Sequence, residues 1–311
     1  MIKIAFLIMA HTDVEELLRL CKKLKSYGDA YIHVDIKANY SFMNRLNSGL
    51  AAMNGQYSTN IIEKRHYVTW GGYSQIRCAE SLLDSALKNA ANYDRFIFLS
   101  GLDYPLCSKE ALQEYCTENA DKEFLRAYNI TNGNDQRQLN KIRYYHFFRD
   151  VPIPFLSVIY GYLCNYSFLV LKAIGIKRKP YISINEKKWD IYMGSQWVGL
   201  TRPCAMYCLD QIKYNQEMVK YFKNSYVPDE LVIPTIILNS KFAKKEYITP
   251  NYNFAESAYL HYLTYKDYMW SFDENDYDQL MKSGKLFARK FISNKSEKLI
   301  ERIDNTTDRN I

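Results

Sequence analysis

The chain opens with short apolar runs that alternate with amphipathic segments. Mainly apolar segments at residues 2–9, 30–35 and 94–101 predict buried β-strands. Apolar positions at helical spacing predict helices over residues 13–27, 74–90 and 109–119. We expect Thr12 and Glu15 to cap the first helix, Gly28 to end it and Ser108 to cap the third. Strands that alternate with helices predict an α/β fold, with a mainly parallel central sheet and helices on both faces.

Polar segments follow three of these strands: AHTD at residues 10–13, HVDIK at 33–37 and SGLDYP at 100–105. In open parallel sheets, ligands bind outside the carboxyl ends of the strands. The three segments are therefore expected to face one crevice.

The pattern loosens after residue 130, and we expect one domain over residues 1–311 with an apolar insert at about 150–180. Residues 151–171 carry no charge, and four basic residues follow in KAIGIKRKP at 172–180. Early prolines, Tyr and Asn positions and a central glycine argue against a full membrane span. Two interpretations stay open: an ordinary core insertion, or an amphipathic segment that packs on the domain or lies peripherally on a membrane with its basic flank on anionic lipid.

Composition changes this picture only modestly. The 311 residues are 48% hydrophobic and carry a net charge of +7, which suits an anionic ligand or membrane face but is too diffuse to indicate nucleic acid. The seven cysteines form no CxxC pair, and the N-terminal apolar run lacks a basic leader and a cleavage site. We therefore expect reduced cysteines in a cytoplasmic protein, with a peripheral position at the inner membrane face as one alternative.

Common nucleotide-binding and hydrolase motifs are absent from the sequence. The one Asp-x-Asp pair, Asp276 and Asp278, lies in a polar stretch that is typical of a solvated helix start. Asp103 at a strand end is a lone carboxylate and thus a weak magnesium site. Arg289 and Lys290 in GKLFARKF either end a solvated helix or neutralise a departing phosphate in place of a metal.

The stretch VPDELVIPTI at residues 227–236 has two interpretations. Pro228 suits the first turn of a helix, where the helix dipole stabilises Asp229 and Glu230 as carboxylates, and Pro234 is expected to limit or kink that helix. Alternatively, Glu230 is a general base, with Asp229 as a cap or supporting residue.

Seven blocks in sequence order resemble the core-2/I-branching β-1,6-N-acetylglucosaminyltransferase and peptide O-xylosyltransferase family. They cover nearly the whole chain: AHTDVEELLRL, YIHVDIK, VTWGGYSQIRCAESLL, FIFLSGLDYPL, GSQWVGLTR, VPDELVIPTI and LFARKF. The resemblance implies a GT-A-type nucleotide-sugar fold and inverting transfer, without a metal cofactor, from a UDP-sugar to a glycan, polysaccharide or glycolipid. GlcNAc or xylose is the implied sugar.

The resemblance also implies roles for individual residues. Glu230 matches the base, and Ser195 and Trp197 lie in the block on the acceptor side, where Trp197 either stacks on a sugar or packs in the core. The implied donor-binding residues are Met9, Ala10, His11, Asp35, Ile36, Lys37, Tyr67, Trp70, Asp103, Arg289 and Lys290.

Two departures from the family pattern concern the C-terminal region. The segment YLHYLTY at residues 259–265 has His261 and Tyr265 where the family often has a basic residue and Trp. Some family members have a second cation that binds the diphosphate, and only Lys266 lies near its expected position here.

A non-catalytic nucleotide- or glycan-binding module of the same fold is the alternative function. Nucleic acid is disfavoured because the basic residues of KIRYYHFFR, at 141–149, do not extend into a continuous basic stripe.

Overall fold

The computed structural model describes residues 1–150, 157–264 and 270–308. The strands are β1 (Ile4–Ala10), β2 (Asp29–Val34), β3 (Thr59–Ile61), β4 (Arg95–Ser100), β5 (Asp103–Pro105), β6 (Ala127–Asn129), β7 (Tyr181–Ile184), β8 (Lys187–Asp190), β9 (Tyr192–Met193), β10 (Gly199–Thr201), β11 (Ile248–Thr249), β12 (His261–Leu263) and β13 (Phe287–Arg289). The α-helices are α1 (Val14–Leu24), α2 (Tyr40–Ala51), α3 (Ser74–Leu87), α4 (Lys109–Glu118), α5 (Gln136–Arg143), α6 (Ser157–Ala173), α7 (Arg202–Tyr214), α8 (Gln216–Phe222), α9 (Val232–Leu238), α10 (Phe254–Ser257), α11 (Tyr277–Lys282) and α12 (Glu297–Thr307). Three short 3₁₀ turns are η1 (Pro228–Glu230), η2 (Lys245–Tyr247) and η3 (Glu274–Asp276).

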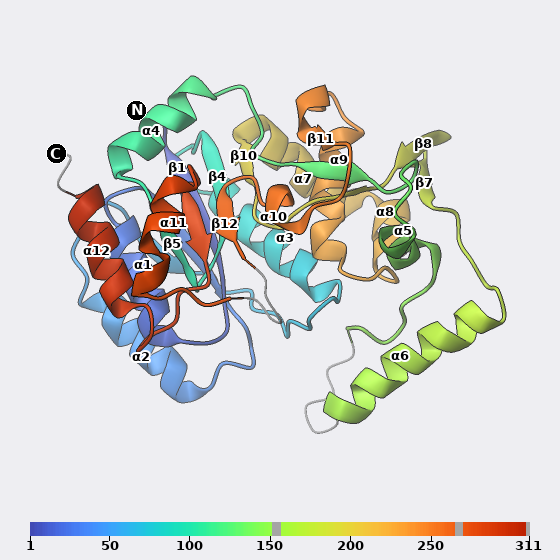
Figure 1. Ribbon diagram of the computed structural model, residues 1–311, viewed down its shortest axis with the longest axis horizontal. Helices are drawn as coiled ribbons and strands as arrows, with labels where there is room; N and C mark the ends of the chain where they lie inside the picture. Colours follow the sequence, from blue (N-terminus) through green and yellow to red (C-terminus); the bar gives the residue numbers. More distant parts are fainter. Residues whose placement is uncertain (151–156, 265–269, 309–311) are drawn as a thin grey trace.

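The central sheet has five strands in the order β10-β4-β1-β2-β3 (Figure 1). Strands β4, β1, β2 and β3 pair in parallel, and β10 joins the edge antiparallel to β4. This arrangement confirms the α/β prediction of a mainly parallel sheet.

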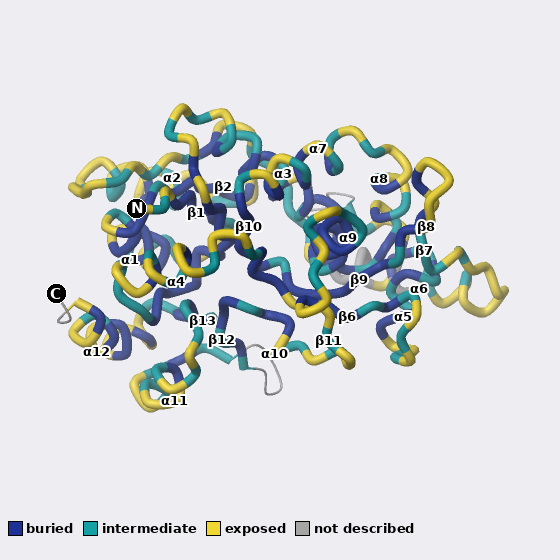
Figure 2. Tube along the Cα trace, turned by 90° about the horizontal axis from the view of Figure 1, so that it is seen from above, coloured by how far each residue is buried: buried dark blue, intermediate teal, exposed yellow. Residues whose placement is uncertain are grey.

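Helices cover both faces of this sheet, because its strands are apolar on both sides. Along β1, Ala5 and Leu7 belong to the core that includes α3 and α7. Phe6 and Ile8 belong to the core that includes α1, α2 and α4. The alternation follows from the two-residue period of a strand. Figure 2 shows the result as dark, buried strands between partly exposed helices.

Smaller sheets are packed beside the central one. Strands β12, β13 and β5 form a three-stranded sheet, in which Arg289 is the register partner of Asp103. Strands β11, β6 and β9 form another, and β7 pairs with β8 as a hairpin. The first of these sheets brings the C-terminal part of the chain to the end of β4. It thereby joins segments that are nearly 190 residues apart.

Two local predictions need correction. The first helix is capped by Asp13 and not by Thr12, since the Asp13 carboxylate accepts the Glu16 N–H at 3.2 Å. That carboxylate also accepts hydrogen bonds from Ser293, so it ties α1 to the C-terminal region. Pro234 does not limit its helix, because α9 begins at Val232 and places Pro234 in the first turn, where no intrahelical N–H is needed.

The predicted insert forms α6, and residues 151–156 of the apolar run lie outside the described residues. Within the described chain, no helix combines the length and the apolar character that a membrane crossing requires. All seven cysteines are unpaired, and six of them are buried. The boundaries of the single domain stay a prediction.

Candidate active site

A cavity of about 540 Å³ opens at the carboxyl ends of β1, β2 and β4. This is the crevice that the polar strand ends predict. Its lining includes Met9, Ala10, His11, Asp35, Lys37, Trp70, Ser195, Trp197, Glu230, Arg289 and Lys290. The structure therefore brings most of the residues implied by the sequence resemblance into one place.

Three implied donor residues lie outside this lining. The Ile36 side chain is largely exposed, and Tyr67 lies beneath the Lys37 ammonium at 4.8 Å from its ring centroid. Asp103 is completely buried below the cavity. Direct contact between Asp103 and a sugar, as the resemblance implied, does not fit this placement.

The Asp103 carboxylate is the centre of a buried hydrogen-bond network next to the cavity. Its carboxylate accepts the Ser100 N–H at 2.7 Å, faces His261 Nε2 at 3.0 Å and accepts from Arg289 Nη1 at 3.1 Å. The Arg289 guanidinium in turn lies over the ring of Trp197, 5.0 Å from its centroid. Asp103 thus fixes the position of Arg289, a cation that lines the cavity. His261 belongs to this buried network and does not contact an acceptor.

Cations gather on one side of the cavity. Lys37 pairs with Asp35 at 3.4 Å, whereas Lys290 has no carboxylate partner in the described part of the chain. Burial lowers the pKa of Lys290, and the neighbouring Arg289 charge lowers it further. Burial and the Arg289 charge also lower the pKa of His11, which favours a neutral imidazole. Such a cluster attracts an anion, and a diphosphate would relieve the repulsion between its members.

Glu230 faces the same cavity with Asp229 beside it. Both follow Val227 in the short turn η1, and the carbonyl of Glu230 accepts the Gly194 N–H at 2.9 Å. Burial, and then the Glu230 charge, raise the pKa of Asp229 to about 8. Burial also raises the pKa of Glu230, so the expectation of a dipole-stabilised carboxylate needs correction. A pKa of about 8 leaves Asp229 mostly protonated at neutral pH.

Lys141 is the cation that sequence reasoning missed. Its ammonium, on α5, lies 3.7 Å from Glu230 Oε2 and opposes the rise in the pKa of Glu230. It also lies 3.6 Å from Met193 Sδ and 5.7 Å from the centroid of the Tyr252 ring. Nothing in KIRYYHFFR marks its first residue as special, because its partner follows 89 positions later in the chain.

The acceptor side is less open than the sequence suggests. Trp197 and Ser195 are buried, and Ser195 Oγ accepts the Trp197 N–H at 3.1 Å. Trp197 therefore presents only part of its ring to the cavity. Trp70 is the exposed aromatic residue of the lining, with its ring edge-on to Tyr226 at 5.6 Å.

No group of three or more metal-ligating side chains occurs among the described residues. Asp276 accepts hydrogen bonds from Trp270 Nε1 and the Asp273 N–H, and Asp278 lies in the first turn of α11. The interpretation of this pair as a helix start is confirmed. Lys266 and Tyr265 lie outside the described residues.

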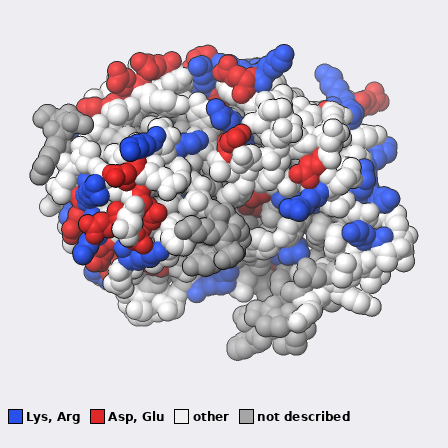
Figure 3. Space-filling view, viewed as in Figure 1, with Lys and Arg blue, Asp and Glu red and all other residues white. Residues whose placement is uncertain are grey.

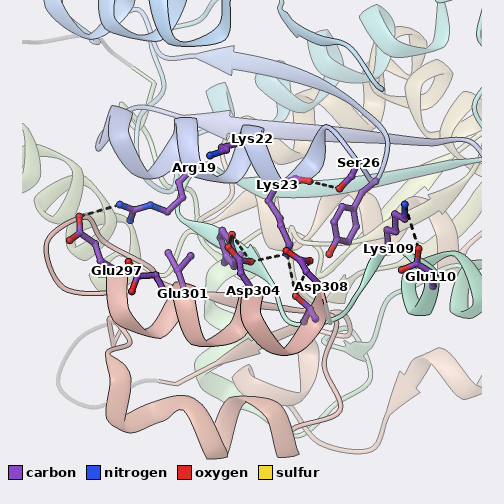
Figure 4. Close-up of a pocket in the computed structure, with 14 residues that line it drawn as sticks. Arg19, Lys22, Lys23, Ser26, Lys109, Glu110, Glu297, Glu301, Asp304 and Asp308 are labelled. Carbon is purple, nitrogen blue, oxygen red and sulfur yellow. Dashed lines mark hydrogen bonds and ion pairs between the residues drawn. The ribbon is translucent and has the colours of Figure 1, made fainter. Parts of the chain in front are cut away.

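A second hollow of about 820 Å³ lies between α1 and α12 and shares no lining residue with the first (Figure 4). Its charged groups already pair across the two helices: Lys23 contacts Asp304 at 2.8 Å and Asp308 at 2.6 Å, and Arg19 contacts Glu297 at 3.1 Å. These ion pairs hold α12 against α1. Because the charged groups of this hollow already pair with one another, we do not assign the active site to it.

The chain matches a known protein family over most of its length. A sequence model of the Core-2/I-Branching enzyme family matches residues 4–279. The chain belongs to this family. The match spans every cavity segment except the one with Arg289 and Lys290, which follows it. Family membership agrees with the family that the sequence blocks resemble.

Individual relatives agree with the family match. Xylosyltransferase 2 from Canis lupus familiaris is 30% identical over 151 residues, which cover 47% of this chain and 17% of the relative. A xylosyltransferase from Ciona intestinalis is 23% identical over 97% of this chain and 34% of its own length. This family member thus spans 17% to 34% of the length of these curated relatives.

Solved structures show only distant similarity. Core-mannan synthase A from Aspergillus fumigatus aligns over 80% of this chain and 72% of its own, with a TM-score of 0.38 and 11% identity. Mouse xyloside xylosyltransferase 1 aligns over 77% and 83%, with a TM-score of 0.31 and 7% identity. Similarity at this level carries no argument about this site.

Proposed function

We propose that this chain is an inverting glycosyltransferase that moves a sugar from a UDP-sugar to a hydroxyl of a glycan acceptor. One observation carries the proposal: a carboxylate, Glu230, and a group of cations line one cavity at the strand ends. A general base and a site for a leaving diphosphate are the two parts that such a transfer needs.

The reaction is a single displacement. The acceptor hydroxyl oxygen attacks the anomeric carbon while Glu230 takes its proton. The bond from that carbon to the diphosphate oxygen breaks, and its electron pair leaves with UDP. Because a sugar hydroxyl is a poor nucleophile at neutral pH, a positioned base contributes roughly 10²–10⁴-fold. A second, nucleophilic carboxylate is not required when the configuration inverts.

The negative charge that develops on UDP is met by protein cations. Arg289 is fixed by Asp103, Lys290 follows it in the same segment, and Lys37 comes from the segment after β2. Cations that are already in place stabilise a developing charge without reorganisation during the reaction. This supports the proposal that transfer proceeds without a metal cofactor.

The donor and acceptor follow from the family. We propose UDP-xylose as the donor, since the curated relatives are named xylosyltransferases, or UDP-GlcNAc, which the resemblance of the sequence blocks implied. The proposed acceptor is a glycan, polysaccharide or glycolipid. A cytoplasmic location also remains a proposal.

A donor panel tests the class. The purified chain is incubated with UDP-GlcNAc, UDP-xylose and other UDP-sugars in EDTA, and UDP release and thermal shift are measured. We expect one donor to stabilise the protein and release UDP in EDTA. UDP binding without transfer to any glycan would favour a non-catalytic module, and activity restored only by a divalent ion would refute metal independence.

Glu230→Gln tests the base. The variant is expected to lose roughly 10²–10⁴-fold in kcat with UDP binding retained, because the amide cannot accept the proton. Glu274→Gln, at an exposed glutamate on η3, is the matched control. Turnover by Glu230→Gln at the rate of the unmodified enzyme would remove Glu230 from this role.

A further inference from the structure

Helix α6 has apolar or aromatic side chains on its inner and outer sides. On its inner side Cys164 is buried, and Phe168 stacks on His146 at 4.7 Å and meets Tyr144 edge-on at 5.8 Å. On its outer side the exposed fractions are 72% for Tyr162 and 69% for Tyr166. A helix that is apolar on all faces is normally buried on all faces. The outer face of α6 therefore lacks the cover that its composition calls for.

The exposed side chains form one continuous surface. Tyr162, Tyr166 and Leu169 follow one another at spacings of four and three residues, which places them on the same face of the helix. Ile174 and Ile176 extend this surface beyond the last turn, with exposed fractions of 63% and 44%. In Figure 1, α6 stands apart from the body of the protein, so no other helix packs against this face in the part of the chain that is drawn as ribbon. We call these five residues the α6 face.

Charge distinguishes the possible partners of the α6 face. No acidic residue occurs between Asp150 and Glu186, whereas Lys172, Lys177 and Lys179 are present in that stretch. Figure 3 shows the edge of the molecule along α6 and the segment after it as white and blue, without red, apart from its grey residues. Apolar and tyrosine side chains flanked by lysines are typical of helices that lie in the interface of an anionic membrane.

The orientation of α6 is fixed from its carboxyl end. Arg178 donates from Nη1 to the Tyr221 carbonyl at 2.7 Å and from Nη2 to Ser225 Oγ at 2.5 Å. Arg178 thus points inward and pins the segment after α6 to α8. The neighbouring Lys177 and Lys179 are exposed, where a lipid surface would meet them.

We propose that the α6 face binds the surface of an anionic phospholipid bilayer, with the helix lying along the interface. The described helix does not cross a membrane, so the contact is peripheral. At the start of the insert, the Asp150 carboxylate accepts from Thr69 Oγ1 at 3.1 Å and the Ser74 N–H at 2.9 Å. Those residues flank Trp70, which lines the cavity. If the proposed function holds, such docking would present lipid-linked acceptors to the site.

Vesicle co-sedimentation of the full chain tests this inference. Phosphatidylcholine vesicles are compared with vesicles that also contain phosphatidylserine, at low and high salt. We expect binding only to the anionic vesicles, weakened by salt. Replacing Lys172, Lys177 and Lys179 with Gln should weaken binding about 100-fold, at roughly fivefold per lysine.

The apolar part is tested separately. Tyr166→Ser combined with Leu169→Ser should abolish vesicle binding, whereas Tyr214→Ser should leave it unchanged, because Tyr214 is equally exposed on α7 at 73%. Thermal shift with UDP-sugar checks that each variant is folded. Absence of vesicle binding by the unmodified chain would overturn the inference. So would a dimer in sedimentation that the double variant dissolves, since a second copy would then cover the face.

Failure of this inference and of the proposed function are distinguishable. UDP release with a soluble acceptor reports on the cavity, and vesicle binding reports on the α6 face. An enzyme that transfers sugar but ignores anionic vesicles refutes only the membrane contact.

Discussion

Replacing Lys141 with Met is expected to move the pH dependence of sugar transfer. Lys141 is the only cation that pairs with Glu230 among the described residues, at 3.7 Å. Besides the two carboxyls, Asp135 acts on Lys141, and it supplies no positive charge. Without the ammonium, both carboxyls of the pair bind protons more tightly. The base is then protonated at a higher pH than before.

The distance sets the size of the effect. Two unit charges 3.7 Å apart interact with about 4.5 kcal/mol at an effective dielectric constant of about 20, which corresponds to about 3 pKa units. The Glu230 side chain opens on the cavity, so water screens part of this interaction. We expect the pKa that governs the acid limb of kcat/KM to rise by roughly 1–2 units. At a pH well below that pKa, kcat/KM should fall roughly 10–100-fold.

The assay is kcat/KM for UDP release with acceptor present, measured from pH 5 to pH 9. Lys141→Arg keeps the charge and should keep the profile near its original position. Lys88→Met, at an exposed lysine on the surface, controls for the loss of one positive charge. An acid limb that stays in place in Lys141→Met would refute the pairing, and an equal loss at all pH values would indicate a purely structural role for Lys141.

Three further predictions concern the same cavity. Lys290→Met should weaken UDP binding and lower kcat by about 10-fold or more, measured by titration calorimetry and initial rates, because the leaving diphosphate loses a cation. Asp229→Asn should raise stability at pH 9 by about 1–3 kcal/mol and much less at pH 5 in urea unfolding. The sign follows from a folded-state pKa that is raised to about 8: protonated Asp229 stabilises the fold at low pH, and that contribution is lost as the pH rises through 8. Gly194→Ala should lower both stability and transfer, since its Cβ would lie 2.5 Å from the Arg126 carbonyl oxygen. The clash would disturb the segment whose N–H donates to the Glu230 carbonyl. An unchanged melting temperature would contradict this prediction.

Much of the fold was predictable because its signals are local. The apolar runs of β1 and β4 are buried on both faces, and that burial follows directly from their composition. The Ser108 cap was also predictable, since the hydroxyl accepts the Ala111 N–H three residues later. The Asp13 cap was missed because two adjacent residues, Thr12 and Asp13, are both good caps. The choice between them depends on a distant contact with Ser293.

The site was predictable only as far as its segments can be recognised separately. Glu230 came from the combination of a helix start and a family block, and the structure places it on the cavity. The buried position of Asp103 was not predictable, because it depends on the pairing of β5 with β13. The rise in the pKa of Asp229 and Glu230 was missed for the same reason: burial is a property of the packed chain and not of a first helical turn.

By itself, the sequence determined the alternation of strands and helices, the crevice at the strand ends and the family to which the chain belongs. Each of these depends on residues that are close together in the chain. The tertiary structure decided which charges meet: Lys141 pairs with Glu230, and Arg289 pairs with Asp103. It also decided that the outer face of α6 stays exposed. Electrostatic interactions depend on distances in space and on burial, and residues far apart in sequence acquire both only when the chain folds.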